Sequence, residues 1–200
     1  MIIDKITSIW NAIYPHRQII LEDAKIKAKT TSSEEYHAKE MSDGERVTIY
    51  LLGQCLIAPN DMTIIIDEPE IHLHKSIMYR LWDKIEEFCP NKTFIYITHD
   101  LGVVAKVADY VAVMYAGKIV EKGQIEEVFY NPKHPYTWGL LSAMPDLDTD
   151  DDELYTIPGT PPNLTKKIEG EAFAPRNLYA LNIDYRKEAP MFNVGGSHRV

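Results

Sequence analysis

The sequence predicts an α/β fold built around a short parallel sheet, and three observations support this class. Two apolar runs, TIII at 63–66 and TFIYIT at 93–98, lack the polar–apolar alternation of a half-exposed strand. Such runs are typical of parallel strands that are covered on both faces. Between them, apolar residues of the stretch 75–88 recur at helical spacing. A strand, a helix and a second strand in this order form the unit from which parallel sheets are assembled.

The composition is that of a soluble globular domain. The chain has 200 residues, 45% hydrophobic and 26% charged, with a formal net charge of -9. This acidic balance argues mildly against a nucleic-acid-binding surface. No stretch is long and apolar enough to span a bilayer, and the start of the chain does not resemble a signal peptide. We therefore expect a cytoplasmic protein that meets a membrane only through a partner. Cys55 and Cys89 lack metal-type spacing and are expected to be buried and reduced.

The N-terminal part of the chain predicts short elements before the first apolar run. They are a strand-like segment at 2–6, a hairpin at 17–29, a polar loop at 30–35 and a helix at 41–58. The hairpin follows from alternating polarity around a turn at Asp23-Ala24. The helix start follows from Ser42 and Glu45, which match a capping box ahead of an apolar run.

The second half of the chain continues the alternation of strand and helix. The predicted elements are a helix at 99–108, strands at 110–116 and 119–123, and short helices at 125–130 and 135–144. The acidic run at 146–153 is interpreted as a solvated linker, with a cation or basic-partner site as the alternative. We divide the chain into an N-terminal segment with a hairpin (1–38), a core (39–130) and an irregular C-terminal extension (131–200).

Polar residues with catalytic potential follow the two apolar strands. Asp67 and Glu68 end the first strand, and His99 follows the second. The carboxyl ends of neighbouring strands meet at one crevice of an α/β sheet, so these three side chains are expected to converge. A carboxylate suits Mg²⁺, and a neighbouring glutamate can activate water. The serine-capped, glycine-containing helix start at 42–46 offers backbone N–H groups to an anion.

These segments resemble three motifs of the ABC-class ATPases. MSDGER resembles the signature motif, in which Met41, Ser42, Gly44 and Glu45 match and Asp43 replaces a glycine. TIIIDEPE resembles the Walker B strand with its catalytic glutamate, and IYITHD the switch-histidine segment. The resemblance implies that Asp67 holds Mg²⁺, Glu68 activates water and His99 contacts the γ-phosphate of ATP. It also implies that the signature residues contact the nucleotide held by a facing subunit.

The two halves of the chain resemble different branches of this class. Residues 1–98 resemble ATPases of the overcoming-lysogenisation type, some of which act in anti-phage defence. Residues 99–200 resemble the C-terminal half of the ATPase subunit of oligopeptide and dipeptide importers, through THDLGVVAKVADYVAVMYAGKIVEKG, NPKHPYTWGLLSAMP and IPGTPPNL. The chain therefore resembles a chimera. The extension contains EGEAFAPRN without a cysteine, so no iron–sulfur cluster is expected.

The loop that holds the phosphates is missing from the sequence. A phosphate loop needs G-x-x-x-x-G-K-[ST] after a strand, whereas the one Gly-Lys pair, Gly117-Lys118, is followed by isoleucine. The resemblance thus implies a partial P-loop NTPase, ABC ATPase-like, whose parallel sheet lacks the phosphate-loop strand between 93–98 and 110–115. Residues 2–6 or another chain are the candidates to fill that place. Whether the chain hydrolyses ATP is left open.

The preferred interpretation is an ATP-binding and ATP-hydrolysing subunit of an ABC-type oligopeptide importer. It implies ATP and Mg²⁺ as cofactors, although binding by this chain alone is expected to be weak. The implied partners are a second ATPase head and membrane-spanning subunits, at the inner face of the plasma membrane. Two alternatives stay open: an interaction module with a vestigial ATP site, and a DNA-linked or anti-phage ATPase.

Overall fold

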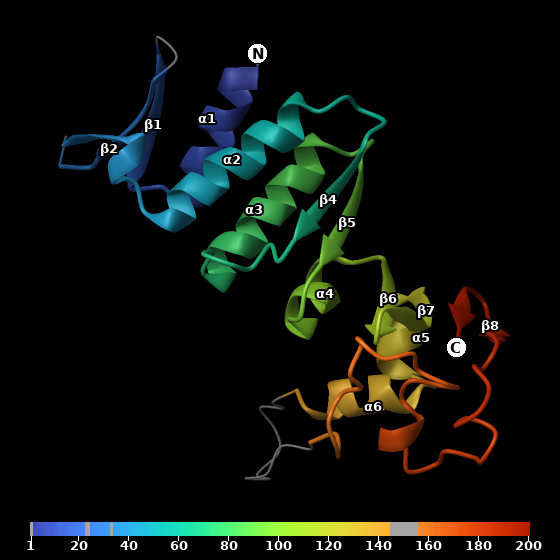
Figure 1. The fold of residues 1–200 in the computed structure, drawn as a ribbon. Coiled ribbons are helices and arrows are strands. Elements are labelled where there is room, and N and C mark those ends of the chain that lie inside the picture. The colour runs from blue at the N-terminus through green and yellow to red at the C-terminus, as the bar shows by residue number, and fades with distance from the viewer. Residues whose placement is uncertain (1, 23–24, 33, 145–155) are drawn as a thin grey trace. The chain divides into compact units, whose positions relative to one another are not determined.

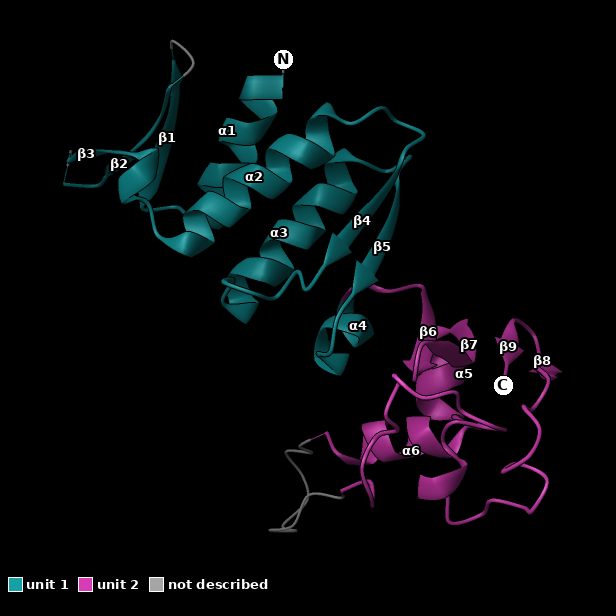
Figure 2. Ribbon diagram, in the orientation of Figure 1, with its two compact units in different colours: residues 1–106 teal, residues 107–200 magenta. Residues whose placement is uncertain are grey.

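A computed structural model describes residues 2–22, 25–32, 34–144 and 156–200 of the chain (Figure 1). The chain divides into two units, residues 1–106 and 107–200, which we describe separately (Figure 2). Within the described ranges, no helix has the length and apolar character needed to cross a membrane. The acidic run at 146–153, predicted as a linker, lies outside the described residues.

The first element is a helix, α1 (Ile2–Ile13), so the strand-like interpretation of residues 2–6 is wrong. The buried residues of α1 are Ile6, Ile9, Trp10 and Ile13, which is the spacing of one helical face. Residues 2–6 contain only the first of these buried positions, so the helical spacing cannot be recognised from that short segment. Residues 2–6 are therefore not a strand that could occupy the place expected for the phosphate-loop strand.

An antiparallel sheet follows α1. Its strands, in spatial order, are β1 (Arg17–Glu22), β2 (Lys25–Thr30) and β3 (Glu35–His37). The register, in which Ile19 lies opposite Ala28, confirms the predicted hairpin. β3 was not predicted, because a strand of three residues is too short to show alternation. Ile19 and Ala28 pack with Trp10 of α1 and with Met41, which follows the short 3-10 helix η1 (Ala38–Glu40).

The predicted parallel strand pair is present in the first unit. The elements in chain order are α2 (Asp43–Ile57), β4 (Thr63–Asp67), α3 (Lys75–Phe88), β5 (Thr93–Ile97) and α4 (Leu101–Val107). β4 and β5 are parallel, with Asp67 opposite Ile97. In Figure 1, α2 and α3 lie side by side next to this strand pair. The α/β class is therefore confirmed.

One face of the β4–β5 pair is covered and the other is exposed. Trp82 of α3 is buried and packs edge-to-face on Tyr96, with ring centroids 5.0 Å apart. On the opposite face Ile65, Ile95 and Ile97 are 65%, 46% and 51% exposed. Side chains alternate across a strand, so a helix on one side covers only every second residue. The expectation of a sheet covered on both faces is met on one face only.

The second unit is built on an antiparallel hairpin. β6 (Tyr110–Tyr115) and β7 (Lys118–Gln124) are joined by a turn at Ala116 and Gly117, both at positive φ. The predicted short helices are present as α5 (Ile125–Tyr130) and α6 (Pro135–Ser142). The extension contains the 3-10 helix η2 (Ala174–Arg176) and two short strands, β8 (Asn193–Gly195) and β9 (His198–Arg199), which add to the edge of β7. The core of the second unit is a cluster of buried residues: Val113, Tyr115, Val120, Val128, Ala172 and Phe173.

The strands of the two units belong to separate sheets. β5 pairs with β4 in the first unit, and β6 pairs with β7 in the second. The expected place of a phosphate-loop strand between 93–98 and 110–115 stays a prediction.

The two cysteines are buried free thiols, as expected from the sequence. Burial raises the pKa of Cys55 to about 11, and the Cys89 thiol donates to the Cys55 carbonyl at 3.6 Å. Because the thiolate is the reactive form, we expect native protein not to react with an aromatic disulfide reagent at pH 8. Both thiols should react after unfolding in urea, measured by released thiolate absorbance. Rapid labelling of either thiol in native protein would contradict this expectation.

Candidate functional site

The parallel strand pair brings Glu68 and His99 together, as the sequence predicted. Glu68 follows β4, and its backbone N–H donates to the carbonyl of Ile97 at the end of β5, at 2.7 Å. His99 lies two residues further on, and its Nε2 is 3.4 Å from Glu68 Oε1. Asp67, the last residue of β4, is exposed next to this pair. Carboxylates and an imidazole therefore meet at the carboxyl ends of two neighbouring strands.

The Glu68 carboxyl has a raised pKa. Interaction with the neighbouring Glu70 carboxyl is the largest cause of the raised pKa, followed by desolvation, and the negative charge of Asp67 adds to it, while His99 acts in the opposite direction. A carboxyl with a raised pKa is a stronger base once it has lost its proton. Glu68 is also one of few non-glycine residues at positive φ, at 47°, in the turn that leaves β4.

Four further polar residues in the segments that follow β4 and β5 were not predicted as site residues. They form two pairs, Glu70 with Thr98 and Lys75 with Asp100. The Thr98 hydroxyl donates to Glu70, and Lys75 Nζ lies 3.0 Å from Asp100 Oδ2. The second glutamate of the DEPE stretch was the available signal for Glu70. No sequence pattern connects Lys75 with Asp100.

The signature-like segment forms the start of α2, as predicted. Ser42 is the N-cap, and its side chain and that of Glu45 form the capping box. Glu45 is buried, accepts from Tyr36 at 2.6 Å and lies 2.5 Å from Arg17. Burial favours the neutral form of Glu45, but the hydrogen bonds from Tyr36, Arg17 and Ser42 outweigh it and lower its pKa. Both carboxylate oxygens of Glu45 are thus occupied within the chain.

Gly44 lies against the turn that follows β4. A Cβ atom added at this position would be 3.1 Å from the carbonyl oxygen of His72, a tight contact with backbone. The first turn of α2 therefore packs directly on the segment that begins at Glu68. Within the described ranges, no hydrogen bond or ion pair joins Ser42, Gly44 or Glu45 to Asp67, Glu68 or His99. The sequence-predicted site residues thus form two groups, one at the start of α2 and one at the ends of β4 and β5.

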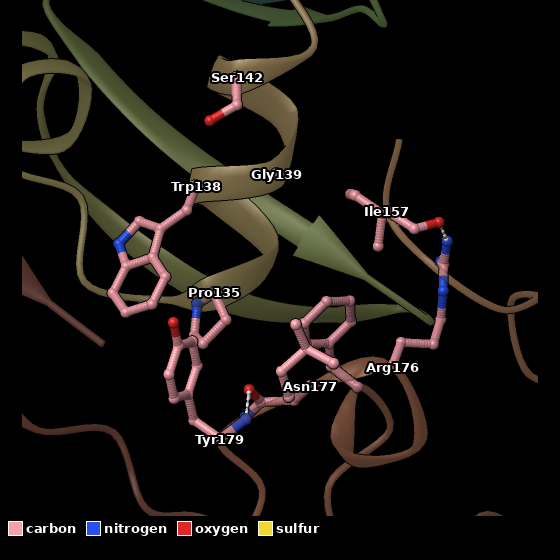
Figure 3. A pocket seen from close by; sticks show the side chains of 10 residues that line it. Pro135, Trp138, Gly139, Ser142, Ile157, Arg176, Asn177 and Tyr179 are labelled. Carbon is pink, nitrogen blue, oxygen red and sulfur yellow. Dashed lines mark hydrogen bonds between the residues drawn. The ribbon is translucent and has the colours of Figure 1, made fainter. Parts of the chain in front are cut away.

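A separate pocket of about 220 Å³ lies in the second unit, between α6 and the residues around η2 (Figure 3). Trp138 and Tyr179 line one side of it, with ring centroids 5.9 Å apart. Arg176 lies on the other side and donates to the carbonyls of Ile157 and Pro158, at 3.1 and 2.8 Å. Its guanidinium is engaged within the chain, so this aromatic pocket does not suit a triphosphate.

Two family models match the chain. Residues 4–105 match the family described as "AAA domain, putative AbiEii toxin, Type IV TA system". Residues 120–183 match "Oligopeptide/dipeptide transporter, C-terminal region". The two matches do not overlap, and they leave residues 106–119 between them, where the boundary of the two units lies.

Curated relatives of the chain are transporter ATP-binding subunits. "Oligopeptide transport ATP-binding protein OppD" of Bacillus subtilis is 47% identical over 164 residues, covering 80% of this chain and 45% of that protein. "Oligopeptide transport ATP-binding protein AmiE" of Streptococcus pneumoniae is 52% identical over 161 residues, covering the same shares. The chain thus spans about half the length of the curated relatives it matches. A match over 80% of the chain also extends beyond residues 99–200 into the first half.

Among solved structures, the Smc head domain from Pyrococcus furiosus, bound to the C-terminal domain of ScpA, matches with a TM-score of 0.49 and 24% identity. That match covers 64% of this chain and 36% of the other. Together, the family models and the curated relatives show that the chain belongs to the AAA-domain family and resembles the ATP-binding subunits of ABC-type oligopeptide transporters.

Proposed function

We propose that the chain is the catalytic half of an ATP-binding, ATP-hydrolysing head of an ABC-type oligopeptide importer. The observation that carries the proposal is the pairing of Glu68 with His99, at 3.4 Å, at the carboxyl ends of two parallel strands. Phosphoryl transfer requires a group that orients water and donors that face the terminal phosphate. In this proposal, residues 39–130 form the ATPase core and residues 131–200 a transporter-type extension.

Each site residue has a distinct role in this proposal. Asp67 holds Mg²⁺ through its hard carboxylate oxygens, and the ion supplies charge neutralisation at the phosphates. Glu68 accepts a proton from the attacking water, and His99 donates a hydrogen bond to the γ-phosphate. Ser42 and Gly44 present the start of α2 to the nucleotide of a facing subunit. Glu45, whose oxygens are engaged within the chain, serves this contact by holding Ser42 in place.

The phosphate loop comes from a second polypeptide segment in this proposal. The sequence contains no G-x-x-x-x-G-K-[ST], and the curated relatives are about twice as long as the matched region. Parallel sheets are normally covered on both faces, yet Ile65, Ile95 and Ile97 are exposed. An α/β segment that carries the phosphate loop would cover this face and supply the remaining contacts to Mg-ATP. The further partners proposed are a second ATPase head and membrane-spanning subunits, which would hold the chain at the inner face of the plasma membrane.

Mg-ATP binding by the isolated chain is the first expected result. Calorimetric titration should give no resolvable heat up to about 1 mM nucleotide, because the loop that contributes most contacts to the phosphates is absent. Hydrolysis by the isolated chain should stay at background, and Glu68→Gln should not change it. Micromolar binding would contradict the assignment of the missing loop to a second segment.

Hydrolysis by the assembled complex tests the function itself. A tagged chain would be purified from its host together with its partners, and ATP turnover would be measured in the complex. Glu68→Gln should lower kcat by at least about 100-fold, the usual contribution of a general base. Glu34→Gln, which removes an exposed carboxylate in the same unit, should leave turnover unchanged. A complex with transporter subunits but without turnover would favour the interaction module instead.

A second candidate function is supported by the family description of residues 4–105, which names a toxin–antitoxin system. A DNA-linked or defence ATPase would bind duplex DNA with an affinity that falls steeply as salt rises. The net charge of -9 argues against this candidate. Fluorescence anisotropy with labelled duplex at two salt concentrations distinguishes it from the transporter subunit.

A further inference from the structure

Two side-chain links join the segment after Glu68 to both neighbours of His99. The Thr98 hydroxyl donates to the Glu70 carboxylate. Lys75 Nζ, at the start of α3, pairs with Asp100 Oδ2 at 3.0 Å. Thr98 and Asp100 are the residues immediately before and after His99. The backbone that carries the histidine is therefore held from both sides by the segment that carries the glutamate.

Both neighbours of His99 are also fixed from within their own segment. The Thr98 hydroxyl oxygen accepts from the N–H of Asp100 at 3.0 Å. Asp100 Oδ1 accepts from the N–H groups of Gly102 and Val103, at 2.8 and 3.2 Å, and so begins α4. By contrast, the His99 side chain is 96% exposed and pairs with Glu68. The imidazole is therefore positioned by the backbone that carries it and by its pairing with Glu68, because almost nothing packs around the ring.

The placement of Glu70 is not explained by stability alone. Its Oε1 accepts from Thr98, while Oε2 is buried without a hydrogen-bond partner among the described residues. A buried oxygen without a partner lowers stability, because no protein hydrogen bond replaces the hydration that it lost. The Lys75–Asp100 pair adds little stability, because Lys75 is exposed and water screens its charge. A segment selected only for stability would not need either group.

We propose that the Glu70–Thr98 and Lys75–Asp100 links form a clamp that positions His99 opposite Glu68. Glu70, Thr98 and Lys75 are positioning residues, because they act through His99 and do not reach the reacting atoms. Glu68 and Glu70 belong to one turn, in which Ile71 N–H donates to the Glu68 carbonyl at 3.0 Å. The base and the imidazole are therefore presented to the nucleotide as one unit. A role of this clamp in catalysis rests on the proposed function, whereas the arrangement of its residues does not depend on it.

The clamp is tested in the isolated chain without nucleotide. The readout is the nuclear Overhauser effect between the His99 ring protons and the Glu68 side-chain protons, in protein labelled with ¹³C and ¹⁵N. It should be present in the native sequence. It should fall at least about twofold in Thr98→Val, which keeps the shape of threonine but loses the hydroxyl that donates to Glu70 and accepts from Asp100. It should return in Thr98→Ser, which keeps that hydroxyl. Lys75→Met should weaken it further when combined with Thr98→Val.

Matched controls separate positioning from general destabilisation. Lys84→Met removes the exposed Lys84–Glu87 pair, at 2.6 Å on the same helix as Lys75, and should leave the signal unchanged. The melting temperature of each variant is measured alongside. If Thr98→Val does not fold, the comparison of Lys75→Met with Lys84→Met carries the test. An unchanged His99–Glu68 signal in a folded variant lacking both links overturns the clamp.

The same variants in the assembled complex separate this inference from the proposed function. Thr98→Val should lower kcat about tenfold, the factor that corresponds to 1.4 kcal/mol, with little change in KM for ATP, and Thr98→Ser should restore it. A complex that never hydrolyses ATP would refute the proposed function and leave the nucleotide-free signal as it is. A complex whose turnover falls in Glu68→Gln but not in Thr98→Val would refute the clamp alone.

Discussion

Replacing Glu121 by alanine is expected to lower the free energy of unfolding of residues 107–200 by about 3–4 kcal/mol, because several buried hydrogen-bonding groups lose their partner at once. Glu121 is fully buried in β7. It accepts from the backbone N–H groups of Lys133 and His134, at 2.6 and 3.0 Å, and lies 2.7 Å from His198 Nε2. One carboxylate thus connects the start of α6 and the strand β9 to the hairpin.

The expected loss has a defined physical origin. Without the carboxylate, two backbone donors and a buried imidazole have no acceptor, and each unsatisfied group costs about 1–3 kcal/mol. Urea denaturation followed by circular dichroism measures the change. Glu126→Ala, which removes an exposed carboxylate in the neighbouring helix α5, is the control and should stay within about 0.5 kcal/mol of the parent. A Glu121→Ala loss below about 1 kcal/mol would contradict the expectation.

Replacing Glu45 by alanine is expected to destabilise the first unit by about 2–3 kcal/mol, because several charge-assisted hydrogen bonds are lost together. Glu45 joins the start of α2 to the antiparallel sheet through Tyr36 and Arg17. Arg17 is partly exposed and regains water, so the loss should be smaller than for Glu121. Asp43→Ala, in the same helical turn but exposed, is the control and should have little effect.

The contribution of Glu45 should depend on pH. Its pKa in the folded chain lies below the ordinary value of 4.5, so the unfolded chain binds a proton first as pH falls. The stabilisation is therefore complete above pH 4.5 and is lost as pH falls through the lower folded value. Glu45→Gln should flatten this acid limb of the stability curve. An unchanged limb in Glu45→Gln would assign the pH dependence to other carboxylates.

Features carried by neighbouring residues were predicted correctly from the sequence. Polarity patterns and capping residues that extend over only a few neighbouring positions were enough to predict four elements. These are the hairpin at 17–29, the capped helix from Ser42 and the strands at 63–66 and 93–98. The meeting of Glu68 with His99 also followed, because parallel strands end at the same edge. α1 was missed where the window was shorter than the helical period. The roles of the site residues in binding and hydrolysis stay predictions.

Contacts between distant segments were decided by three-dimensional packing. Glu121 and His198 are separated by 77 positions, and Thr98 and Glu70 by 28. Local sequence patterns do not predict such pairs. The residues around each partner look the same as those around an ordinary surface carboxylate, hydroxyl or imidazole. The exposed face of the β4–β5 pair could not be predicted either. The same apolar run occurs in strands that are covered on both faces and in strands that are covered on one. Burial and pairing are properties of what packs against a residue, and that depends on chain segments outside any local window.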